Sequence, residues 1–92
     1  MNNEEYEKMA NERRQMKILK RVCLQYRGGI RKFFACEGFI CQLYEVNGVF
    51  NPCVVIAGSD GVGDRYVPIK TVTPESILEA VRERIVCDIM TC

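Results

Sequence analysis

Eight basic side chains stand between Arg13 and Cys36, and no acidic residue lies among them. They are Arg13, Arg14, Lys17, Lys20, Arg21, Arg27, Arg31 and Lys32. All twelve carboxylates and the other basic residues lie outside this segment, so the formal net charge of +1 conceals a strongly cationic block. Because a surface of one sign attracts partners of the opposite sign, the block predicts binding. It fits an acidic protein surface, the phosphates of nucleic acid or, in the plainest interpretation, solvent alone.

Catalytic chemistry has little support in the residue types. The sequence contains no histidine, which removes the commonest general base and any Cys–His or Ser–His pair. Cys23 lies near Lys20 and Arg27, whose charges could activate a thiolate, but a core position for this thiol is favoured. The sequence therefore predicts a protein that is not an enzyme, with no catalytic residue and no cofactor.

Six cysteines raise the question of cross-links or metal. An even number would permit a disulfide framework, yet the chain has enough aliphatic residues for a core, so reduced and mostly buried thiols are favoured. Cys36 and Cys41 share the spacing of Cys87 and Cys92, which is within the loose range for zinc ligand pairs. A turn at Gly38 and a frayed C-terminus would be needed to bring the four together. No metal site is predicted, and disulfides and zinc remain as alternatives.

The glycine-rich segment from Gly58 to Asp64 resembles a phosphate loop only superficially. It has no lysine, a strand is expected after it, and Asp60 and Asp64 would repel phosphate. A connecting loop is favoured. The alternative is a small-nucleotide site completed by Arg65 and a second subunit.

A helix is expected over residues 1–27, which contain no glycine or proline. At about 100° per residue, Met9, Met16, Leu19, Cys23 and Tyr26 fall on one arc and the basic residues on the opposite one, with Glu12 and Leu24 as exceptions. Residues 1–8 have few apolar anchors and are expected to fray. Gly28-Gly29 ends the helix.

β-branched and aromatic residues dominate the next part of the chain. Strands are expected over 30–46, with a turn, bend or bulge at Gly38, over 49–57 after an Asn47-Gly48 hairpin turn, and over 65–72. Pro52 should lie on an edge or at a bulge. Thr73-Pro74 begins a second helix. Residues 1–92 thus form one α+β domain of order αβββα, with a mainly antiparallel sheet of three to four strands between an N-terminal and a C-terminal helix.

The strand segment 30–46 lacks the apolar–polar alternation of a sheet with one wet face. Ile30, Phe34, Cys36, Ile40 and Tyr44 alternate with Phe33, Ala35, Phe39, Cys41 and Leu43. Three explanations remain open: helices on opposite faces, a second chain on one face, or a change of phase at Gly38. The second would make the protein a homodimer.

A small binding protein is the favoured function. It would dock its basic helix face on an acidic surface of a partner protein or nucleoprotein machine, as an adaptor or as an inhibitor that blocks a nucleic-acid-binding cleft. Such proteins include modulators of host machinery encoded by viruses or mobile elements. With no secretory signal and no apolar run of about 20 residues, a soluble, cytoplasmic protein without a membrane partner is expected. Direct nucleic-acid binding through residues 13–32 is the main alternative, with Tyr26, Phe33 and Phe34 available to stack on bases.

Overall fold

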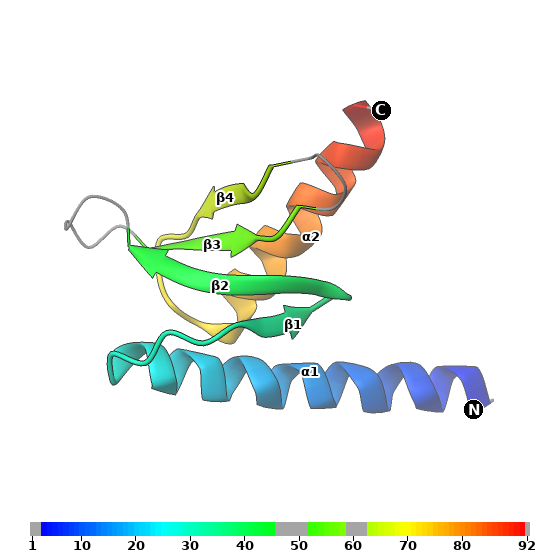
Figure 1. The fold of residues 1–92 in the computed structure, drawn as a ribbon. Coiled ribbons are helices and arrows are strands. Elements are labelled where there is room, and N and C mark those ends of the chain that lie inside the picture. Colours follow the sequence, from blue (N-terminus) through cyan, green and yellow to red (C-terminus); the bar gives the residue numbers. More distant parts are fainter. Residues whose placement is uncertain (1–2, 46–51, 59–62, 92) are drawn as a thin grey trace.

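The protein folds as a four-stranded antiparallel sheet that follows one helix in the chain and precedes another, which confirms the predicted α+β class (Figure 1). The computed structural model describes residues 3–45, 52–58 and 63–91, with side chains up to Ile85. The elements are α1 (Asn3–Arg27), β1 (Phe34–Cys36), β2 (Phe39–Glu45), β3 (Pro52–Ile56), β4 (Arg65–Pro68) and α2 (Pro74–Thr91). The strands lie in the sheet in their chain order.

The end of α1 is set by its two glycines. Gly29 has a φ of 84°, a left-handed conformation that favours glycine. Its amide donates to the Tyr26 carbonyl at 3.0 Å, and the Ile30 amide donates to the Gln25 carbonyl at 2.8 Å. This pair of bonds is a Schellman motif, which satisfies the last carbonyls of a helix. The helix therefore ends at Arg27, as the Gly28-Gly29 pair predicted, and the chain then continues to β1.

The turn between β1 and β2 decides the orientation of the sheet residues. Glu37 and Gly38 both have positive φ, 54° and 82°, and Cys36 pairs directly with Phe39. This is the geometry of a two-residue type I′ hairpin. The turn changes the phase of the alternation, so that Phe34 and Cys36 share a face with Cys41 and Leu43. Of the three explanations for the missing alternation, the change of phase is present.

The hairpin expected around Asn47-Gly48 is present in its strands. β2 and β3 pair antiparallel, with Tyr44 opposite Cys53 and Glu45 opposite Pro52, while the turn itself lies outside the described residues. The prediction for Pro52 was wrong, because β3 is a central strand paired on both sides. Proline is tolerated there since it is the first residue of the strand, where its missing N–H is least needed.

Both helices cover the same face of the sheet, which excludes helices on opposite faces, one of the three explanations left open for the missing alternation. One hydrophobic cluster joins Leu19 and Cys23 of α1, Ile77 and Val81 of α2, and the inward residues of the strands, such as Val54. Leu19, Val54, Ile77 and Val81 are completely buried. In Figure 1, α1 runs along the β1 side of the sheet and α2 crosses behind the strands.

The N-terminal half of α1 extends past the sheet, as Figure 1 shows at its blue end. No side chain of α1 before Leu19 is fully buried, and every described side chain before Ala10 is exposed. At the other end of the chain, the Thr73 side chain accepts a hydrogen bond from the Ser76 amide at 3.2 Å, which makes it the predicted N-cap of α2. Neither helix, over its described residues, is apolar enough along its length to cross a membrane.

Candidate partner-binding surface

Five of the predicted site residues form one exposed surface on α1, here called the basic ridge. It consists of Arg13, Arg14, Lys17, Lys20 and Arg21, all exposed. Spacings of three and four residues place them on one side of the helix, opposite Leu19, Val22, Cys23 and Tyr26, which enter the core. The ridge therefore points away from both the core and the sheet.

No carboxylate among the described residues forms an ion pair with the ridge, although Glu12 lines a hollow together with Arg13, Lys17 and Lys20. Among the described residues, no hydrogen bond or ion pair engages Arg13, Lys17, Lys20 or Arg21. Arg14 donates to the side chain of Asn11 at 3.3 Å, a neutral acceptor on the same helix. Four cations thus face solvent with their charge available to a partner.

Two of the other predicted site residues have internal contacts that the sequence did not indicate. Arg27 donates to the carbonyl of Val72 at 3.1 Å. Arg31 donates to the carbonyl of Tyr26 at 2.9 Å, lies 4.1 Å above the centre of the Tyr26 ring, and approaches the Glu45 carboxylate at 3.7 Å. These contacts hold the end of α1 against the sheet. Lys32 is exposed in the segment that precedes β1, so the predicted stripe of eight is continuous only over the ridge.

Two large apolar side chains accompany the ridge, and sequence analysis did not assign either to the site. Tyr6 is 69% exposed and Leu24 is 67% exposed. By helical spacing both share the side that carries Arg13, Lys17 and Lys20, one toward each end. A shallow hollow of about 360 Å³ lies beside Tyr6, Met9 and Arg13. The signal for Leu24 was its position as an exception to the apolar arc.

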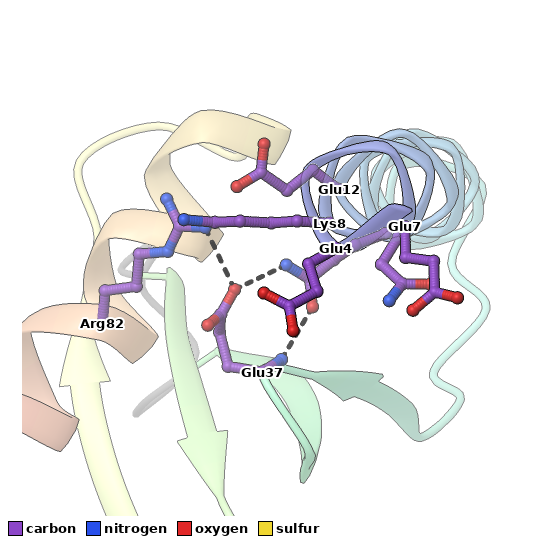
Figure 2. A pocket seen from close by; sticks show the side chains of 8 residues that line it. Glu4, Glu7, Lys8, Glu12, Glu37 and Arg82 are labelled. Carbon is purple, nitrogen blue, oxygen red and sulfur yellow. Dashed lines mark hydrogen bonds and ion pairs between the residues drawn. The ribbon is translucent and has the colours of Figure 1, made fainter. Parts of the chain in front are cut away.

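Four carboxylates line a different hollow, of about 470 Å³, between α1, α2 and the β1–β2 turn (Figure 2). Its centre is Glu37, whose carboxylate accepts a hydrogen bond from Gln15 at 2.6 Å and pairs with Arg82 at 3.2 Å. The Glu37 amide in turn donates to the Gln15 side chain at 2.7 Å. Glu4, Glu7 and Glu12 line the same hollow. Glu37 therefore fastens the two helices to the turn, a role that its place in the sequence does not indicate.

The described thiols are buried, and three of them, Cys23, Cys36 and Cys41, belong to the hydrophobic core. Cys23, Cys36, Cys41 and Cys53 are free and buried. Burial raises the pKa of Cys36 to about 12 and that of Cys41 to about 11, and it also raises the pKa of Cys23 despite the nearby Arg27 charge. A raised pKa opposes thiolate formation, so burial works against the nucleophile considered for Cys23. No group of three or more metal-ligating side chains occurs within the described residues, which exclude the side chains of Cys87 and Cys92.

The segment weighed as a nucleotide site is described only at its ends, because residues 59–62 lie outside the described part of the chain. Asp64 accepts a hydrogen bond from the Gly58 amide at 3.2 Å, which closes the connection between β3 and β4. Arg65 belongs to β4 and has interactions of its own.

Comparison with known proteins finds no match to a family model, to a curated protein or to a solved structure. The surface that the residues build is a cationic helix face with Tyr6 and Leu24 beside it. Glu12, which lines the hollow around Glu37, also borders this face.

Proposed function

We propose that the protein is a non-enzymatic binding protein that docks the basic ridge on an acidic surface of a partner protein or nucleoprotein machine. It acts by occupancy, as an adaptor or as an inhibitor. The observation that carries the proposal is the charge of Arg13, Lys17, Lys20 and Arg21, which are exposed and have no internal partner among the described residues. Charge of one sign on a projecting helix raises the rate of encounter with an acidic surface.

The apolar groups beside the ridge favour a protein partner. Protein interfaces combine a desolvated centre with a charged rim, and Leu24 and Tyr6 supply apolar surface next to the cations. A phosphate backbone would instead use an uninterrupted row of cations, whereas Arg27 and Arg31 are bound to the protein itself.

Direct nucleic-acid binding is the competing proposal, and the position of Phe33 supports it. This ring is 71% exposed and adjacent to Lys32, so it is available to stack on a base. Tyr26 and Phe34, the other two aromatic residues considered for stacking, are buried in the core.

A pair of matched charge reversals tests the proposal. Lys17→Glu with Lys20→Glu removes charge from the ridge, and Lys8→Glu with Lys70→Glu makes the same change of net charge elsewhere. Each variant is immobilised and exposed to lysate of the native host at physiological salt, and the captured proteins are quantified by mass spectrometry.

Capture of the ridge partner should fall by about tenfold or more in the ridge variant, because several charge contacts are reversed together, and should persist in the control. Equal capture by both variants would refute the role of the ridge. Binding of wild-type protein to generic DNA or RNA, with affinity falling by orders of magnitude between about 50 and 200 mM salt, would favour the nucleic-acid proposal.

A further inference from the structure

The sheet face that the helices leave uncovered is largely apolar, unlike an ordinary solvent-facing sheet. Its residues include Ile40, Tyr44 and Tyr66, which are 59%, 50% and 62% exposed. Cross-strand pairing places Gln42, Val55 and Tyr66 in one row, and Tyr44, Cys53 and Pro68 in the next. An antiparallel sheet with one wet face normally turns polar residues outward.

Charge is absent from this face over the described strands. The two charged strand residues are Glu45 and Arg65. Glu45 pairs with Pro52, and Arg65 pairs with Ile56 opposite Cys41, so both belong to the face that the helices cover. In a chain of which 27% is charged, an uncharged outer face rich in tyrosine has the composition of an interface centre.

We infer that this face is the contact surface between two copies of the chain, packed sheet against sheet. The face can meet itself without like-charge repulsion, whereas a dimer through the basic ridge would oppose cation to cation. Packing two such faces about 10 Å apart would enclose the tyrosines in a second core, as in a β-sandwich.

The available area is sufficient for a weak contact between two copies. Four strands at about 4.8 Å spacing, each roughly five residues long, present a flat area of about 300 Å². With side-chain relief, two copies would bury on the order of 1,000 Å², at the lower end of specific interfaces. Edge-to-edge pairing would form few backbone hydrogen bonds, since the edge strands β1 and β4 are three and four residues long. We therefore expect a dimer that dissociates in the micromolar range.

The geometry keeps this contact independent of the proposed function. α1 packs on the covered face and its basic ridge points away from the core, so a face-to-face dimer leaves both ridges open. The dimer would present two cationic surfaces on opposite sides.

Sedimentation velocity between about 1 and 500 µM tests the inference, with a matched pair of tyrosine variants. Tyr66→Glu places a charge in the sheet face, and Tyr6→Glu places one on α1 at a similarly exposed position. Wild-type protein should move from 10.6 kDa toward twice that mass with concentration. Tyr66→Glu should raise the dissociation constant by about tenfold or more, and Tyr6→Glu by less than about twofold.

Three results would overturn the inference: wild-type protein that stays at the monomer mass throughout, a Tyr66→Glu variant that dimerises normally, or a dimer broken by Tyr6→Glu instead. Circular dichroism confirms folding of each variant. Should Tyr66→Glu fail to fold, Ile40→Lys on the same face, compared with Leu24→Lys on α1, makes the same distinction. The ridge variant with Lys17→Glu and Lys20→Glu should dimerise like wild type, so loss of partner capture and loss of dimerisation are separate outcomes.

Discussion

Replacing Gln15 by alanine should loosen the attachment of α1 to the rest of the protein. The Gln15 side chain makes two short hydrogen bonds to Glu37, one to its carboxylate and one from its amide, across 22 residues of sequence. Both groups are partly buried, so the lost bonds are replaced only in part by water. The Arg82–Glu37 pair remains, but it is too exposed to contribute much.

The expected cost is about 1–2 kcal/mol in the free energy of unfolding, since a typical intramolecular hydrogen bond contributes about 1 kcal/mol net and one of these is charge-assisted. Urea denaturation measures this directly, and the midpoint temperature should fall by about 4–8 °C for each kcal/mol. The N-terminal half of α1 projects beyond the sheet and has no fully buried side chain, so its amide hydrogens should also exchange faster than in wild type.

Asn11→Ala is the matched control, one turn earlier on the same helix. Within the part of the chain that the structure describes, the Asn11 side chain bonds only to the exposed Arg14, so its loss should cost no more than about 0.5 kcal/mol. If Gln15→Ala proved as stable as Asn11→Ala, the proposed attachment of α1 through Glu37 would be refuted.

Two further predictions concern the glycines at the end of α1 and the buried phenol of Tyr26. Gly29→Ala should lower the free energy of unfolding by roughly 1–2 kcal/mol, because Gly29 has a φ of 84° that a side chain disfavours. Gly28→Ala, at a position with no left-handed φ, should lower it by less. Equal losses in urea denaturation would contradict the Schellman assignment. At high pH, burial and the hydrogen bond to Glu45 raise the pKa of Tyr26 to about 12, so the unfolded chain loses this proton near pH 10 while the folded protein retains it. The resulting stabilisation is complete below about pH 10 and is lost as pH rises to about 12, by about 2 kcal/mol, and Tyr26→Phe should remove this part of the decline. Parallel stability–pH curves for the two proteins would show that Tyr26 does not contribute.

Local signals predicted most of the secondary structure. The glycine pair ends α1, Thr73 caps α2, and the positive-φ residues at Glu37-Gly38 make the turn that was one of three options at Gly38. These features depend on residues a few positions apart, where backbone sterics and capping bonds act. The basic ridge was predicted equally well, because helical spacing alone places charges on one side.

Predictions that required distant partners were incomplete. Arg27 and Arg31 counted as surface cations in the sequence, yet they bind the Val72 carbonyl, the Tyr26 ring and Glu45. Glu37 showed no sign of its contacts with Gln15 and Arg82, which lie 22 and 45 positions away. The sequence does not show whether an arginine side chain faces solvent or contacts a distant part of the folded chain.

Sequence patterns alone predicted the type and order of the helices and strands, and a helix whose cations lie opposite its apolar arc, although the observed strands are shorter than the expected segments and α1 is already helical from Asn3. Only the tertiary structure decided that both helices cover one face of the sheet, which leaves Tyr44 and Tyr66 uncovered and places Glu45 and Arg65 on the helix side. Local backbone sterics do not distinguish between the two faces of a strand when both carry apolar residues. The choice between them depends on how the helices fill the core, a property of residues that meet only in the folded protein.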